Sequence, residues 1–390
     1  MNFELSQEQE SIRDAVRALC ERFPESYWLE RDADGVFPHE FYAAMGKAGW
    51  LGIAMPEEYG GAGLGVQEAA IMMQTIAESG ACLSGASSVH INIFGLMPVV
   101  VHGTEEQKQR MLPPIIKGDL KACFGVTEPD AGLNTTRLKT RAVRKGDKYV
   151  VNGQKVWIST AQVADKILLL ARTTPIEDLP PGRTSHGLSL FYTDLDRSKI
   201  DVRMIDKMGR HCVDSNELFI EDLEIPVEDR IGEEGKGFKY LLHGMNPERV
   251  LLAAEAIGVG RIALQKAAAY AAERKVFDRP IGMNQAIQHP LARNWVELEA
   301  AELLTAKAAW LYDNGRECGA EANAAKYFAA EAGFRACEQA ILTHGGMGYS
   351  REFHVERYMR EIMIPRIAPV SRELILSHIA ERVLGLPKSY

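Results

Sequence analysis

Apolar residues recur at helical spacing in the first 120 residues and again after residue 235. In residues 1–120, apolar positions lie three and four apart, and the Gly- and Pro-rich segment MPEEYGGAGLG (55–65) interrupts them. Ser6 opens SQEQ, a capping-box pattern that predicts the start of a helix. The Ala-rich stretches 249–275 and 293–313 repeat this spacing, which is typical of long helices in an antiparallel four-helix bundle.

The middle of the chain has a different pattern, with short runs rich in β-branched and aromatic residues. The first of them, KYVVNGQKVWIS (148–159), contains Asn152-Gly153, so we predict a hairpin turn at these two residues. Similar runs follow at 166–173, 187–195 and 216–225. The sequence therefore predicts an α+β fold of three domains, which are a helical domain (1–120), a β-barrel-like β domain (121–235) and a helical bundle (236–390).

Composition indicates a soluble globular protein, because 46% of the residues are hydrophobic and 25% are charged. A net charge of −8 without basic clusters argues against nucleic acid or an anionic membrane as a partner. We expect no membrane span, because the apolar runs fall short of about 20 residues. The six cysteines form no CxxC pair, and the first residues resemble a helix more than a signal peptide, so we expect reduced thiols and a cytoplasmic location.

One segment matches a dinucleotide motif by spacing alone. GVGRIA (258–263) fits GxGxxA, but the motif requires a preceding strand, and here it lies within a helical pattern. We therefore expect Gly258 and Gly260 to allow close packing between helices. The chain contains no GxxxxGK[ST], HExxH or GxSxG, so the usual signals of P-loop, zinc-protease and α/β-hydrolase chemistry are missing.

Five segments together resemble the acyl-CoA dehydrogenase family in order and spacing. They are VTEPDAG (126–132), NGQKVWIS (152–159), DKMGRHCVDSNELFIEDLEIPVEDRIGEEGKGF (206–238), ERKVFDRPI (273–281) and HGGMGYS (344–350). The resemblance implies an FAD enzyme of fatty acid β-oxidation that converts an acyl-CoA thioester to the trans-2-enoyl-CoA. In that reaction a carboxylate removes the α-proton and the β-hydrogen leaves as hydride to flavin N5. The resemblance also implies an electron-transfer flavoprotein as the acceptor.

The same resemblance implies two strands that line the flavin. Ser159 would place its hydroxyl near flavin N5. Other interpretations exist, because Val126 and Ile158 could be core residues and Trp157 could serve packing alone. We favour the flavin interpretation, because a planar cofactor needs apolar walls and a few fixed polar contacts. The residues implied at these strands are Phe124, Val126, Thr127, Trp157, Ile158 and Ser159.

A second group of residues resembles the family's contacts to the adenosine part of FAD from a neighbouring subunit. It implies a shared site and hence a homotetramer or homodimer. Alternatively, Arg274 is a solvated cation at a helix end and Gly345-Gly346 is a helix-terminating turn. The residues that resemble the adenosine contacts are Arg274, Phe277, Gln285, Gly345 and Gly346. Ser371 is a further expected cofactor-binding residue outside this group.

The catalytic base is expected at Glu248. Most family members carry this glutamate late in the bundle, where this chain has Pro369, but the isovaleryl and long-chain branches place it just before an arginine, as in Glu248-Arg249. We expect Asn246 to cap the helix and Pro247 to be its first residue, which puts Glu248 in the first turn. A first-turn glutamate could equally well only complement the helix dipole. An apolar pocket must then raise its pKa against the dipole.

Other carboxylates and substitutions complete the expected site. Glu255, two turns further on, is the reserve base, whereas Glu128 has a structural role. Arg249 and Leu133, which replaces the family's usual serine, are expected at the substrate.

Pro369 lacks the N–H that polarises the thioester in the family. Either the Val370 N–H replaces it, or the register shifts by one, or the chemistry differs. The alternatives to a dehydrogenase are therefore an oxidase or an elimination on the same scaffold, or a flavin-binding protein without turnover.

Overall fold

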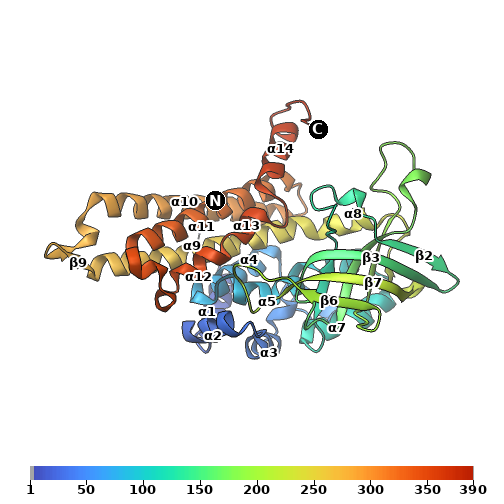
Figure 1. Ribbon diagram of the computed structural model, residues 1–390, viewed down its shortest axis with the longest axis horizontal. Coiled ribbons are helices and arrows are strands. Elements are labelled where there is room, and N and C mark those ends of the chain that lie inside the picture. Colours follow the sequence, from blue (N-terminus) through green and yellow to red (C-terminus); the bar gives the residue numbers. More distant parts are fainter. Residues whose placement is uncertain (1–3, 390) are drawn as a thin grey trace.

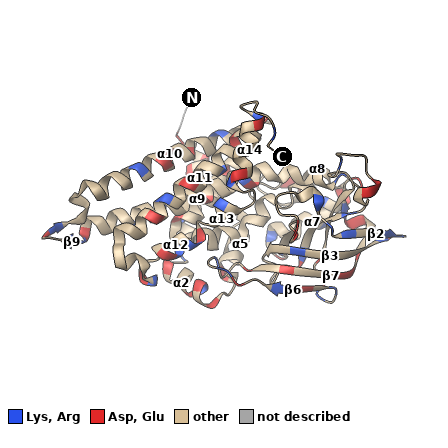
Figure 2. Cartoon of the chain, turned by 45° about the horizontal axis from the view of Figure 1, so that its top comes forward, with Lys and Arg blue, Asp and Glu red and all other residues tan. Residues whose placement is uncertain are grey.

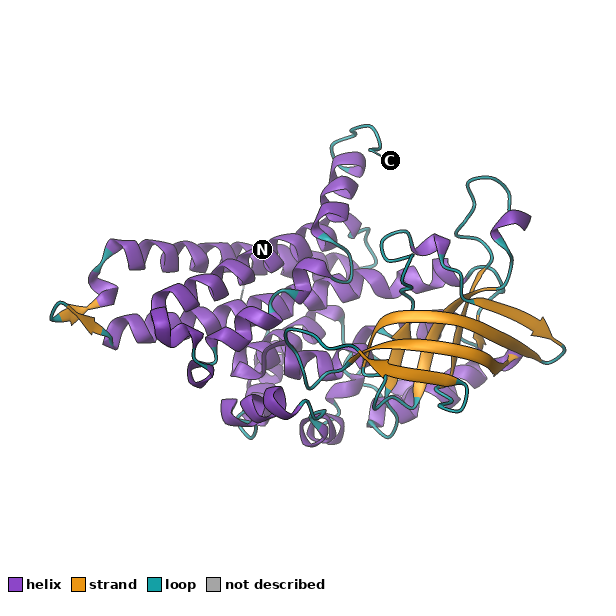
Figure 3. Cartoon of the chain, viewed as in Figure 1, coloured by secondary structure: helices purple, strands orange, loops and turns teal. Residues whose placement is uncertain are grey.

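The computed structural model describes residues 4–389 and has a helical N-terminal region, a central β-sheet and C-terminal helices, which confirms the predicted α+β class (Figures 1 and 3). The sheet lies at one end of the molecule, and the long C-terminal helices extend away from it (Figure 1). Figure 2 shows Lys and Arg interspersed with Asp and Glu along these elements, without a large patch of one sign.

The N-terminal region consists of seven α-helices. The predicted capping box is confirmed, because Gln9 N donates to Ser6 Oγ and Ser6 N donates to Gln9 Oε1, each over 3.1 Å. A π-helical turn, Ala77–Ala81, connects the fourth helix to the fifth. The helices are α1 (Gln7–Cys20), α2 (Glu25–Asp34), α3 (His39–Lys47), α4 (Val66–Ile76), α5 (Cys82–Phe94), α6 (Met97–His102) and α7 (Glu105–Lys117).

The stretch from α4 to α6 is long and apolar. By length and composition, Val66–His102 could cross a membrane, since an 18-residue window reaches a mean hydropathy of 1.4. However, 72% of that window is buried inside the protein. Its apolar side chains therefore form core, as the buried helices of globular proteins do.

The central sheet has eight strands in the order β6-β7-β3-β2-β4-β5-β8, and β1 pairs with β4 in parallel. Its interior faces are packed with aliphatic and aromatic side chains. The strands are β1 (Ala122–Gly125), β2 (Arg141–Lys145), β3 (Lys148–Ser159), β4 (Lys166–Arg172), β5 (Leu188–Asp194), β6 (Ile200–Met204), β7 (Ser215–Pro226) and β8 (Arg230–Ile231).

The hairpin predicted at Asn152-Gly153 was wrong. Strand β3 runs through both residues, and the chain turns instead at Gly146-Asp147, between β2 and β3. The pairing of β3 with β7 shifts register between Val151 and Gly153, which marks a β-bulge. A Cβ on Gly153 would lie 2.4 Å from Thr140 Oγ1, so glycine is needed here for close approach and not for a turn.

Three long helices dominate the C-terminal region. A two-stranded ribbon, β9 (Lys275–Val276) and β10 (Arg279–Pro280), connects the first two of them. α9 packs against α10, α11 and the N-terminal α4. The helices are α8 (Gly237–Leu241), α9 (Met245–Glu273), α10 (Gln285–Asp313), α11 (Gly319–His344), α12 (Val355–Glu361), α13 (Ile364–Ile367) and α14 (Arg372–Arg382).

The GVGRIA segment lies inside α9, and its glycines sit at helix contacts, as predicted. A Cβ on Gly258 would lie 2.4 Å from the backbone oxygen of Gln74 on α4. A Cβ on Gly260 would lie 3.0 Å from Gly333 Cα on α11. α9 therefore packs directly against the backbones of two neighbouring helices.

This packing predicts that Gly258→Ala destabilises the protein. The added methyl group meets backbone atoms that cannot move separately, so we expect the free energy of unfolding to fall by about 1–3 kcal/mol in urea titrations. Gly319→Ala is the matched control, because a Cβ there meets nothing within 4 Å. Equal stability of the two variants would contradict the packing role of Gly258.

Candidate active site

Glu248 lies in the first turn of α9, but the expected cap is not formed. The chain is helical from Gly237 onwards through α8 and a 3-10 turn (Leu242–Gly244), and α9 begins at Met245. The prediction that Asn246 caps the helix was wrong, because the preceding turns already supply the helical backbone. Asn246 Oδ1 instead accepts a hydrogen bond from Arg249 Nη1 over 3.0 Å.

The Glu248 carboxyl group is half-buried, and its Oε2 is enclosed without a hydrogen-bond partner among the described residues. Burial raises the pKa of this carboxyl to about 7, and the charge of Glu255 adds to the rise. The charges of His90, Arg249 and Lys326 oppose it. A carboxylate with these properties can exchange a proton near neutral pH, as a general base must.

Glu255, the reserve carboxylate, is fully buried and already paired. His90 Nδ1 on α5 donates to Glu255 Oε1 over 2.5 Å. Sequence reasoning did not find His90, since a single histidine on an apolar helix gives no signal of its partner. Seven residues separate Glu248 from Glu255, or about 10 Å along the helix, so the two carboxylates occupy different positions.

Lys326 on α11 is a second residue that the sequence did not reveal. It is buried, and its Nζ donates to the backbone oxygen of Val370 over 2.6 Å. Burial, followed by the charge of Arg249, lowers the pKa of this amine to about 8. Lys326 is therefore bonded to the segment around Pro369, and its positive charge also lowers the pKa of Glu248.

The segment after Pro369 has free backbone donors, because neither the Val370 nor the Ser371 N–H bonds to another described residue. The Val370 N–H makes no hydrogen bond to any other part of residues 4–389. The Ser371 hydroxyl caps α14, accepting from Leu374 N over 3.3 Å, so it is occupied locally.

Arg249, beside Glu248 on α9, donates from Nη1 to Met245 O over 3.2 Å, and its Nε is enclosed and unpartnered among the described residues.

The end of β3 turns an aromatic side chain out of the sheet. Trp157 has a φ of +61° at a second register shift and is 59% exposed. An exposed tryptophan on a strained backbone indicates a ligand surface. Ser159, two residues on, is half-buried, and Arg210 Nη2 donates to its Oγ over 3.2 Å. Arg210 itself is buried and was not found from the sequence.

The other flavin-strand residues divide into two groups. Val126 and Ile158 are buried in the core, so only their backbones could face a cofactor. Phe124 is half-buried, with its ring 5.6 Å from that of Phe94 on α5. Thr127, which follows Val126 in the chain, is also half-buried. Leu133, expected at the substrate, is exposed.

A buried ion pair holds the loop after β1. Lys155 Nζ donates to Glu128 Oε1 over 2.9 Å and to Val126 O over 3.0 Å. Glu128 also accepts from the backbone N–H groups of Lys139 and Thr140. Glu128 therefore has the structural role predicted for it.

The residues expected at the adenosine part of FAD lie far from these strands. They sit where α9 meets α10 through the β9–β10 ribbon and where α11 ends, and Figure 1 shows that ribbon at the opposite end of the molecule from the sheet. Phe277 is 94% exposed with a φ of +52°. Arg274, Gln285, Gly345 and Gly346 are also exposed.

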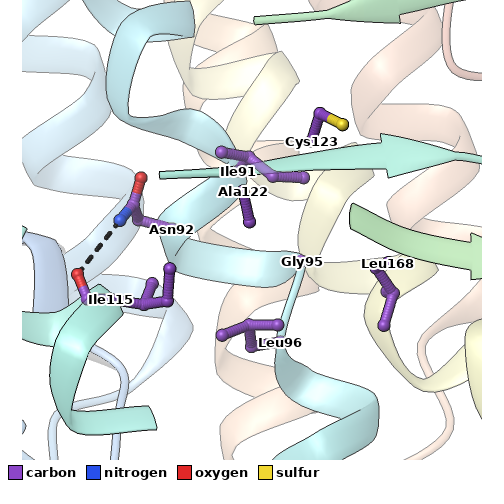
Figure 4. A pocket seen from close by; sticks show the side chains of 8 residues that line it. All are labelled: Ile91, Asn92, Gly95, Leu96, Ile115, Ala122, Cys123 and Leu168. Atoms are coloured by element: carbon purple, nitrogen blue, oxygen red, sulfur yellow. Dashed lines mark hydrogen bonds between the residues drawn. The ribbon is translucent and has the colours of Figure 1, made fainter. Parts of the chain in front are cut away.

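A narrow gap lies between α5, α7 and the sheet (Figure 4). Its walls are mostly apolar, and Asn92 Nδ2 donates across it to Ile115 O over 3.3 Å. None of the expected site residues line it, and it has no room for a water molecule, so it is far smaller than a ligand pocket. We interpret it as a packing gap.

Comparison with known proteins identifies three consecutive family models. Residues 6–119, 123–223 and 235–384 match the acyl-CoA dehydrogenase N-terminal, middle and C-terminal domains. The chain is 38% identical over 390 residues to acyl-CoA dehydrogenase FadE12 of Mycobacterium tuberculosis, covering 99% of this chain and 98% of that one.

Two solved structures have the same fold. A chain from a structure of the electron transferring flavoprotein of Acidaminococcus fermentans is 33% identical, with a TM-score of 0.93 over 98% of this chain and 100% of that one. The FAD complex of PigA is 25% identical, with a TM-score of 0.92 over 99% and 100%.

The raised pKa of Glu248 predicts a pH-dependent cost to stability. The folded pKa of about 7 exceeds the ordinary value of 4.5, so the free energy of unfolding falls as pH rises between these values. Glu248→Gln removes the titrating carboxyl group and with it this fall in the free energy of unfolding. We therefore expect the difference in free energy of unfolding, variant minus wild type, to be roughly 2 kcal/mol larger at pH 8 than at pH 4.5 in urea titrations. The exposed Glu352→Gln control should show no such gain.

Proposed function

Because the chain belongs to the acyl-CoA dehydrogenase family and has that family's oxidoreductase activity, we propose that Glu248 is the base that removes the α-proton of the acyl-CoA thioester. One observation carries this proposal, namely the enclosed and unpartnered Oε2 of a carboxyl group whose pKa burial raises to about 7. Glu255 is a weaker candidate because it is fully buried and bonded to His90.

FAD is the proposed cofactor, since members of the family bind it and the similar PigA structure is an FAD complex. This chain's residues fit the group, because Trp157 offers an exposed aromatic face and Ser159 a hydroxyl two residues away. Phe124 and Thr127 would line the same region, with backbone contacts from Val126 and Ile158. FAD, when bound, accepts the hydride that leaves the β-carbon.

The protein's own contribution is to move the α-proton and to polarise the carbonyl. Glu248 takes the proton on Oε2 in an enclosed setting, where a neutral carboxylic acid is the stable product. Positive charges on Arg249 and Lys326 keep enough carboxylate present at neutral pH. We assign the thioester oxygen to the free Val370 N–H, because Pro369 has none to donate.

We further propose a homotetramer or homodimer with FAD shared between subunits. The ring-proximal strands and the Arg274–Gln285 ribbon lie at opposite ends of one chain, so a single FAD cannot reach both within it (Figure 1). Apolar side chains along one long helix are also exposed, which is typical of a protein interface. On α10 they are Trp295, Val296, Leu303 and Trp310.

Electron-transfer flavoprotein is the proposed acceptor, supported by the family and by the match to a chain from a structure of such a flavoprotein. We place the reaction in fatty acid β-oxidation in the cytoplasm. Arg249, beside the base, and exposed Leu133 are proposed substrate contacts. Ser371 is also a proposed cofactor contact. Its hydroxyl already accepts a hydrogen bond from Leu374 N at the start of α14, so it would act as a donor to the cofactor.

Glu248→Gln tests the base directly. The purified variant should stay yellow, whereas the rate at which acyl-CoA bleaches the flavin anaerobically should fall by about 10²- to 10⁴-fold, because the amide cannot accept the proton. Stopped-flow absorbance measures this rate. Glu255→Gln is the matched variant and should retain most of the bleaching. The opposite ranking of the two variants would transfer the role to Glu255.

Arg274→Ala tests the shared cofactor site. We expect weaker FAD retention at an unchanged fold, measured by flavin absorbance after gel filtration. Co-expression with a Ser159→Ala, Trp157→Ala chain should restore FAD in mixed oligomers, since some sites then combine two intact halves. Arg183→Ala, an exposed arginine in the β domain, is the control. Normal FAD retention by Arg274→Ala would exclude this contact.

A further inference from the structure

A histidine and a glutamate form a buried pair between α5 and α9 that the proposed mechanism does not use. His90 Nδ1 donates to Glu255 Oε1 over 2.5 Å, and the two side chains are 14% and 0% exposed. Glu255 has no solvent to stabilise its charge, so it depends on this bond. In turn, the bond fixes the orientation of the imidazole ring.

The other ring nitrogen of His90 has no partner. Nε2 makes no hydrogen bond to any described residue, and the exposed fraction of the side chain leaves it accessible. Burial lowers the pKa of the ring, but the charge and hydrogen bond of Glu255 outweigh it, so the pKa is raised above its usual 6.5. The charge of Glu248 also raises the pKa of His90, whereas the charge of Arg210 lowers it. The ring therefore tends to keep a proton on Nε2.

The His90 ring lies near the proposed base and near the strand proposed to line the flavin. The charge of His90 acts on Glu248 more strongly than any other neighbouring charge. The ring of His90 lies 4.9 Å from that of Phe94, which lies 5.6 Å from that of Phe124 on β1. A row of rings thus leads from His90 towards the strand proposed to line the flavin, with the proposed base close by.

We propose that His90, oriented by Glu255, is a specificity-determining residue that donates from Nε2 to a neutral oxygen, a hydroxyl or an oxo group, on the acyl chain. The oxygen lies beyond C3, because C2 and C3 lose the hydrogens. This proposal rests on the assignment of Glu248 as the base, since that assignment places the acyl chain beside His90.

The chemistry favours a neutral oxygen over the alternatives. An all-methylene chain would remove water from the Nε2 donor without replacing its hydrogen bond, and a site with an unpaired buried donor discriminates against such a substrate. A carboxylate would lie among the negative charges of Glu255 and Glu248, which oppose it. A hydroxyl or ketone accepts the bond without adding charge.

Acyl-CoA pairs of equal length provide the test. We compare hexanoyl-CoA with its 4-, 5- and 6-hydroxy and its 4- and 5-oxo analogues, and with the adipic acid monothioester. The measured quantity is the rate constant of anaerobic flavin reduction divided by the Kd of the substrate. The wild type should prefer at least one neutral oxygenated analogue about tenfold or more. His90→Leu should lose that preference, because the oxygenated substrate slows more than hexanoyl-CoA does. The effect of this substitution on Glu248 is common to both substrates and cancels in their ratio. His90→Gln should keep part of the preference, because its amide can donate.

Phe94→Leu is the matched control, since it changes the apolar wall beside His90 without changing hydrogen bonding. It should alter both members of a pair by the same factor. The proposal is overturned if His90→Leu does the same, or if the wild type prefers hexanoyl-CoA or the carboxylate analogue. If His90→Leu does not fold, an equal preference for the oxygenated substrate over hexanoyl-CoA in wild type and His90→Gln overturns it. Bleaching retained by Glu248→Gln would refute the base assignment, whereas the His90 comparison reports only specificity.

Discussion

Close packing along α9 is the constraint on which the rest of the structure depends. Every residue from 250 to 260 is buried, and Gly258 and Gly260 bring the helix against the backbones of α4 and α11. Glu255 lies in the middle of this stretch, so its carboxylate must find a partner inside the protein. His90 on α5 supplies it, and the apolar packing thereby fixes the position of a polar pair.

Glu248 stands where the same helix emerges from that packing. It is enclosed enough for burial to raise its pKa, yet open enough for a proton to reach it. The helix dipole and the cations Arg249 and Lys326 act in the opposite direction. The balance leaves the carboxyl near its titration point at neutral pH, which neither burial nor charge would achieve alone. Packing therefore determines the acid-base chemistry of the site.

The length of α9 and α10 has a second consequence. It separates the sheet from the β9–β10 ribbon, so residues that the family brings to one cofactor lie at the two ends of this chain (Figure 1). The exposed apolar side chains of α10 lie along the same long helices. One geometric feature thus accounts for both the division of the proposed cofactor site and the exposed apolar surface at which we propose another subunit.

The sequence alone determined the α+β class, the capping box at Ser6, the packing role of Gly258 and the structural role of Glu128, because local spacing and short motifs carry these features. It failed at Asn152-Gly153 and Asn246, where a partner strand and preceding helical turns override a local signal. His90, Arg210 and Lys326 were decided by tertiary structure, since their partners lie 165, 51 and 44 residues away in the sequence. Packing brings such groups together, and no local pattern records which distant residue a buried charge will meet.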